Sequence, residues 1–226
     1  TPGAFWCWAV GVTVAAIVAL LHAGELQAQA AALVASPRHM VLAWLMYPFI
    51  KAIHELAHGL AARRHGVSVR QAGITLLMLA PVPFVNASGA DALRVRQQRA
   101  VISAAGIMAE LAVAALALGA WVVVQPGTIR DLALIAMLLG AVSTIAVNGN
   151  PLMRFDGYYL ACDVLDLRNL APRSAAWWRD ALARHALGQA PARPFEAMPG
   201  ERPWLAAYAP LATLYRAILS VTIGLW

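Results

Sequence analysis

The chain has 226 residues, of which 61% are hydrophobic and 12% are charged, and its mean hydropathy is +0.66. This balance excludes an ordinary soluble domain, so we expect lipid to surround most of the chain. The net charge of +6 would allow a nucleic-acid partner, but the placement of the arginines indicates a membrane instead. Cys7 and Cys162 form no CxxC pair and predict neither a disulfide framework nor a zinc finger.

Five apolar segments approach or exceed the roughly 20 residues that a helix needs to cross a hydrocarbon core. The segments are 4–23, 40–62, 100–124, 132–147 and 204–226. They predict an all-α polytopic membrane protein with about five transmembrane helices. The first segment has no preceding basic residue and no clear cleavage pattern, which favours an anchoring helix over a signal peptide. Because the sequence does not begin with Met, we interpret it as a fragment or a trimmed chain, which leaves room for additional domains outside it.

The basic residues indicate how the chain is oriented in the membrane. Six of the 17 lie between the second and third segments and seven lie between the fourth and fifth, whereas the other two connections hold one each. Connections rich in Arg and Lys stay in the cytoplasm. We therefore expect both Arg-rich connections and the N-terminus on the cytoplasmic side.

The connection at 66–88 has a different pattern from the helices around it. It reads GVSVRQAGITLLMLAPVPFVNAS, with β-branched residues, Gly and Pro in place of helical periodicity. This predicts one or two short strands associated with the membrane. A strand edge at membrane depth must be satisfied by protein or by a water-filled cavity, so this segment can hold an extended peptide by strand addition. A plain cytoplasmic loop is the alternative.

Later segments complete the predicted organisation. The fourth span ends at a break, 147–151, where Pro151 disfavours further helix. Trp177 and Trp178 stand beside several arginines and predict a helix at the membrane interface. We predict three parts: a first span with an outer loop at 1–39, a core at 40–170, and an interfacial segment with a last span at 171–226.

The second span carries the strongest chemical signal, the HExxH sequence from His54 to His58. Two histidines four residues apart project from one helical face, one turn apart, and can share a zinc ion. Glu55 is then beside the metal and free to take a proton from zinc-bound water. Ionisable groups are costly in an apolar span, which favours a metal site over two buried histidines bonded to neighbouring helices.

A catalytic zinc site commonly has three protein ligands and leaves a fourth position for water. His65 lies beyond the span and is a poor candidate, and the other histidines fall in or near connections: His22, His39 and His185. Asp156 fits better, because it follows the break at Pro151 at the cytoplasmic end of the fourth span. The arginine-based topology places that end at a depth similar to HExxH.

Two motifs together resemble the site-2 protease family of intramembrane zinc metalloproteases, in particular its bacterial branch of peptide zinc metalloproteases. They are HELAHG at 54–59 and NGNPLMRFDGYY at 148–159. That family pairs HExxH in one span with Asn-x-x-Pro and Asp-Gly in a later span, the Asp being the third ligand. PVPFVN at 81–86 and AGIMAE at 105–110 are also similar, so the resemblance covers roughly 45–170.

The resemblance implies one Zn²⁺ per chain, held by His54, His58 and Asp156, with Glu55 as the catalytic base. Asp163 is an alternative carboxylate ligand in a more polar setting. The implied reaction is hydrolysis of a peptide bond in or beside the membrane. The substrate would be a membrane-associated peptide or protein, and the site would lie near the cytoplasmic side of a bacterial inner membrane.

Further residues have less specific assignments. Asn148 is implied to donate to the substrate or the developing oxyanion, and a helix-ending role is the alternative. Glu110 either accepts a hydrogen bond from a metal-binding histidine or pairs with Lys51, and the sequence leaves both open. In the strand-like segment, the residues assigned to substrate binding are Val82, Phe84 and Asn86.

Two other functions are compatible with the same residues. The first is a non-proteolytic zinc-binding component of an export or efflux system, in which the site is structural. The second is a transporter whose intramembrane His, Glu and Asp relay ions, although the chain lacks the duplicated halves common in transporters.

Overall fold

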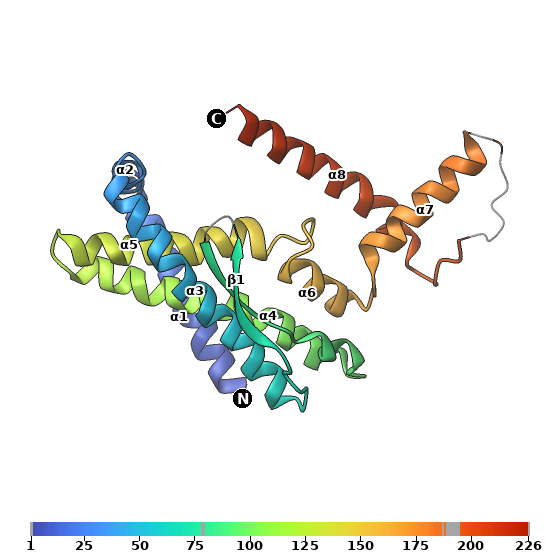
Figure 1. Cartoon of the computed structure of the whole chain (residues 1–226), viewed down its shortest axis with the longest axis horizontal. Coiled ribbons are helices and arrows are strands. Elements are labelled where there is room, and N and C mark those ends of the chain that lie inside the picture. The colour runs from blue at the N-terminus through green and yellow to red at the C-terminus, as the bar shows by residue number, and fades with distance from the viewer. Residues whose placement is uncertain (1, 78–79, 187, 189–194, 226) are drawn as a thin grey trace. The chain divides into compact units, whose positions relative to one another are not determined.

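The computed structural model describes residues 2–77, 80–186, 188 and 195–225. In these residues it contains eight α-helices and one two-stranded sheet, which confirms the predicted fold class. The helices are α1 (Pro2–Leu21), α2 (Ala23–Val34), α3 (Pro37–Arg64), α4 (Arg96–Val123), α5 (Thr128–Val142), α6 (Asp156–Leu165), α7 (Leu170–His185) and α8 (Arg202–Gly224). The strands are β1 (Ala72–Leu77) and β2 (Ala80–Val85), as Figure 1 shows.

Five helices are long and apolar enough to cross a membrane. They are α1, α3, α4, α8, and α5 together with its continuation to Asn148. The connection after α1 contains a helix that the sequence did not indicate, because α2 lies where an outer loop was expected. Its Leu26 and Leu33 are buried in the same core as Trp121. Ala, Leu and Gln favour helix, and that core holds α2 in place.

The chain divides into two compact units, Thr1–Gly149 and Asn150–Trp226. In the first unit α4 packs against α1, α3 and α5, and the apolar core gathers around Trp121 and Leu134. Close approach of α4 and α5 depends on Gly140, because a Cβ there would lie 2.9 Å from the carbonyl oxygen of Glu110. These helices form the framework that carries the HExxH residues.

Helix α3 is unusually long for a membrane span, which matters for the HExxH motif. Its 28 residues extend about 42 Å, whereas a hydrocarbon core is about 30 Å thick. The helix begins at Pro37 and ends beside Gly66, whose φ of +79° lies in the left-handed region that favours glycine. HExxH lies in the C-terminal half of α3, and its His58 is five residues before Arg63 in the last turn of the helix.

Strands β1 and β2 form an antiparallel hairpin, which confirms the short strands predicted at 66–88. Ala72 pairs with Val85, and Leu77 pairs with Ala80. Strand β2 packs on α3, and β1 lies on the other side of β2 with its residues 72–76 exposed. The hairpin therefore presents one edge to α3 and one edge away from it.

The end of the fourth span is a π-helical segment, η2 (Ser143–Asn148). Its wider turn is visible in the bond from the Gly149 N–H to the Thr144 carbonyl, five residues back, at 2.6 Å. The sequence predicted a break at 147–151, and the helix does end there. The π-helical turn before the break was not predicted.

The second unit is built from α6, α7 and α8 around Tyr158, Cys162, Leu170 and Leu205. Ser174 on α7 donates to the carbonyl of Leu205 on α8. Arg173 makes two hydrogen bonds to Glu201, which hold the pKa of that carboxyl below its ordinary value. A helix around Trp177 is confirmed, and its location at a membrane interface stays a prediction.

Candidate metal centre

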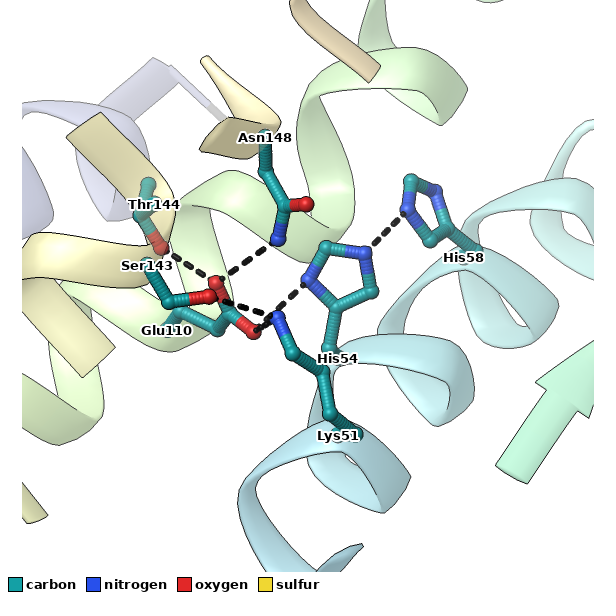
Figure 2. A network of polar contacts seen from close by, with 7 residues as sticks. All are labelled: Lys51, His54, His58, Glu110, Ser143, Thr144 and Asn148. Atoms are coloured by element: carbon teal, nitrogen blue, oxygen red, sulfur yellow. Dashed lines mark hydrogen bonds and ion pairs between the residues drawn. The ribbon is translucent and has the colours of Figure 1, made fainter. Parts of the chain in front are cut away.

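The two histidines of HExxH face one another from successive turns of α3. Their Nε2 atoms are 3.1 Å apart, and both side chains are buried (Figure 2). Two nitrogens bound at 2.0–2.1 Å to a tetrahedral zinc ion would be separated by about 3.3 Å. The spacing of His54 and His58 is therefore already close to that of two zinc ligands.

The other ring nitrogen of each histidine has an oxygen partner on α4. His58 Nδ1 lies 2.7 Å from the carbonyl oxygen of Ile102, and His54 Nδ1 lies 3.2 Å from Glu110 Oε1. A carbonyl oxygen only accepts, so the His58 ring carries a proton on Nδ1. The two Nε2 atoms face one another, and a metal ion can bind both of them once neither carries a proton.

Gly106 on α4 makes room for the two imidazoles. A Cβ at this position would lie 2.4 Å from His58 Nε2 and 2.5 Å from His54 Nε2. Any side chain larger than a hydrogen would therefore occupy the space where the two nitrogens meet. In the sequence, Gly106 stood out only as part of the AGIMAE segment at 105–110, so this role was not predicted.

Glu110 on α4 is fully buried, and it contacts both Lys51 and His54, the two partners between which the sequence did not decide. Its Oε1 lies 2.5 Å from Lys51 Nζ and 3.2 Å from His54 Nδ1. Lys51 also donates to Ser143 Oγ at 3.0 Å. The Lys51 and Glu110 charges compensate one another, and the same carboxylate orients His54 (Figure 2).

The π-helical segment η2 satisfies the second oxygen of Glu110. Thr144 Oγ1 donates to Oε2, and Asn148 Nδ2 donates to the same atom at 3.1 Å. With Lys51 and His54 on Oε1, the carboxylate has two partners on each oxygen, which is its full capacity of about four. The sequence gave no signal for Thr144 or Ser143, since neither belongs to a recognisable motif.

Glu55 points from α3 toward the hairpin. Its Oε2 accepts a hydrogen bond from the backbone N–H of Val85, at 2.9 Å. The side chain is half-buried, unlike the neighbouring imidazoles. A carboxylate held in this way keeps its second oxygen for another partner.

The remaining predicted site residues lie on β2, just after it, and on α6. Val82 is half-buried and Phe84 is exposed, while Asn86 donates to Gln71 Oε1 and accepts from the Ser88 N–H. Asp156 is the first residue of α6, in the second unit, and is half-buried. Its role as a ligand, and the roles of the β2 residues in substrate binding, stay predictions.

The fold and the histidine pair define a class: a helical membrane protein with an HExxH pair on one of its spans. Comparison with known families gives a more specific answer. Residues 42–218 match peptidase family M50, the site-2 protease family of zinc metallopeptidases, and the chain belongs to that family. It is thus an integral membrane protein of a peptidase family. No curated protein and no solved structure gives a significant match.

Replacing Gly106 should abolish metal binding while leaving the helices assembled. In Gly106→Ala the new methyl group meets both Nε2 atoms, so the rings must separate. We expect purified Gly106→Ala to retain less than about a tenth of the zinc of the unchanged chain, measured by atomic emission. Gly119→Ala is the matched control on α4, since a Cβ there meets nothing within 4 Å. Equal zinc in both variants would contradict this role for Gly106.

Removing the Glu110 carboxylate should destabilise the first unit through Lys51. In Glu110→Leu the buried ammonium loses its counter-ion, which we expect to lower the free energy of unfolding by about 3 kcal/mol. The double variant Lys51→Met/Glu110→Leu removes both charges and should recover at least half of that loss. Unfolding in mixed detergent micelles measures these two variants and the single variant Lys51→Met. A double variant as unstable as the sum of the two single changes would show that the two charges do not interact.

Proposed function

We propose that the chain is an intramembrane zinc metalloprotease that hydrolyses a peptide bond in or beside the membrane with zinc-activated water. The observation that carries this proposal is the meeting of two buried Nε2 atoms at 3.1 Å between apolar helices, with both Nδ1 atoms directed at oxygens. In lipid such a polar pair is costly unless a ligand binds it. Membership of a peptidase family supports zinc as that ligand and peptide hydrolysis as the reaction.

His54, His58 and Asp156 would hold one zinc ion per chain. Two imidazoles and one carboxylate are a recognised donor set for catalytic zinc, and leave one position for water. Bound zinc supplies Lewis-acid chemistry and lowers the pKa of that water to about 7. Glu110 would keep His54 in the orientation and tautomer that binding requires.

Glu55 would act as the general base, taking a proton from the attacking water and passing it to the leaving amine. Its position on α3, next to His54, places the carboxylate on the turn that carries the metal ligands. Asn148 would stabilise the negative charge that develops on the carbonyl oxygen of the substrate. One N–H of its amide donates to Glu110, and the amide group has a second N–H for this purpose.

The hairpin would hold the substrate as an extended segment beside α3. A helical substrate must unwind locally, because its carbonyls are otherwise bonded within the helix. Strand β1 has exposed residues along its outer side, which suits pairing with an added strand. Val82, Phe84 and Asn86 would then contribute side-chain contacts from β2.

The site would lie near the cytoplasmic face of a bacterial inner membrane. Arg63 and Arg64 form the last turn of α3, just beyond HExxH, and the connection that follows is rich in arginine. Basic residues beside spans mark the cytoplasmic side. The expected substrate is accordingly a membrane protein or peptide that is accessible from that side.

The ligand role of Asp156 is tested by metal content. We expect Asp156→Ala to lose most of the one zinc ion per chain, because two imidazoles alone bind zinc far more weakly than three ligands do. Asp163→Ala is the matched control: it removes a carboxylate from the same helix, α6, seven residues later. Zinc retained in Asp156→Ala and lost in Asp163→Ala would move the third ligand to Asp163.

The base role of Glu55 is tested by cleavage. In Glu55→Gln we expect zinc to be retained and cleavage to fall by about 10²–10⁴-fold, since an amide cannot take the proton. The probe is a panel of single-span peptides with helix-breaking residues near one end, reconstituted with the purified chain. Cleavage unaffected by Glu55→Gln would exclude this role. A zinc-loaded chain that cleaves no member of the panel would favour the non-proteolytic zinc component.

A further inference from the structure

The register of the hairpin determines which backbone N–H groups of β2 point toward α3. Asn86 N donates to the Gln71 carbonyl at 2.9 Å, so the N–H of residue 86 points toward β1. Successive N–H groups of a strand alternate in direction. The backbone nitrogens of positions 81, 83 and 85 therefore all point away from β1, and those of Val82 and Phe84 point toward it.

Two of those three outward positions have no hydrogen to donate, because they are Pro81 and Pro83. Among the residues of β2, the Val85 N–H is thus the one backbone donor on this edge. It is bonded to Glu55 Oε2 at 2.9 Å. The two prolines therefore leave this edge of β2 with one backbone donor, the Val85 N–H, and it binds the Glu55 carboxylate.

Side-chain packing supports the same contact. Gly59 is one turn after Glu55 on α3, and a Cβ at Gly59 would lie 3.4 Å from Val85 Cγ1. Val85 therefore rests on the helical face that carries Glu55, and the close approach of strand and helix brings its N–H within bonding distance. A charged acceptor makes this bond stronger than one between neutral groups.

We propose that the backbone N–H of Val85 is a positioning group for the catalytic base: it holds Oε2 of Glu55 so that Oε1 is directed to the proton of the attacking water. This rests on the proposed function of Glu55. A long carboxylate side chain otherwise samples several rotamers, and a base that is misplaced by about 1 Å loses up to about 100-fold in rate. The hairpin then has two edges with separate tasks, the β2 edge for Glu55 and the β1 edge for a peptide.

Amide hydrogen exchange tests the contact without requiring any cleavage. The Val85 N–H has no partner in the sheet, so its protection depends on Glu55, whereas the N–H of Phe84 is directed into the hairpin. We expect the Val85 amide to exchange slowly in the unchanged chain and at least about tenfold faster in Glu55→Ala, with Phe84 unaffected. Equal, rapid exchange of Val85 in both proteins would overturn the proposal.

Catalysis is tested by comparing Val85→Pro with Val85→Ala. Proline fits the same edge at 81 and 83, so Val85→Pro removes the donor at a position whose register already accepts proline. Val85→Ala loses the side chain and keeps the donor, so the difference between the two variants isolates the hydrogen bond. We expect kcat of Val85→Pro to be about 10- to 100-fold below that of Val85→Ala, with zinc content equal and KM within about twofold.

The two experiments separate this proposal from the proposed function. Equal kcat in the two Val85 variants, with cleavage by both, would reject the positioning role and leave the protease intact. Absence of cleavage by the unchanged chain would reject the protease, and slow exchange at Val85 would still report the contact. Loss of zinc or of the folded state in Val85→Pro would show that the position does not accept proline, which contradicts the edge geometry on which the proposal rests.

Discussion

The polar groups inside this membrane protein must satisfy one another, because the hydrocarbon core offers no water to do so. Glu110 shows how this is achieved: its two oxygens meet Lys51, His54, Thr144 and Asn148, and the carboxylate is fully buried. Each partner comes from a different turn of α3 or of the π-helical segment after α5. This one carboxylate therefore ties three helices together and orients one histidine of the HExxH pair.

The Glu110 network and the histidine pair can form side by side because α3, α4 and α5 approach one another closely. Gly106 leaves space for two imidazoles, and Gly140 lets α5 reach the backbone of α4 at Glu110. The π-helical turn then brings Ser143, Thr144 and Asn148 to the same group of polar side chains. The polar side chains thus find their partners only while the helices are closely packed. A displaced helix would leave charged groups in lipid without partners.

The hairpin extends this arrangement to the other side of α3. Its prolines leave β2 a single donor toward the helix, and that donor binds the acidic residue of HExxH. This contact joins the hairpin to the residue that we propose as the catalytic base. Under the proposed function, the two histidine ligands, the base and the hairpin that holds the substrate would lie within about two turns of one helix.

The sequence by itself determined the five spans, the hairpin and the identity of the HExxH residues, because hydropathy, strand pattern and four-residue spacing are local properties. It also found Glu110 as a residue that needed a partner. Only the tertiary structure decided that Glu110 serves Lys51 and His54 together, that Gly106 makes room for the imidazoles, and that Val85 binds Glu55. Those contacts join residues 30 to 59 positions apart, and their geometry depends on helix crossings and on a π-helical turn, which no local pattern encodes.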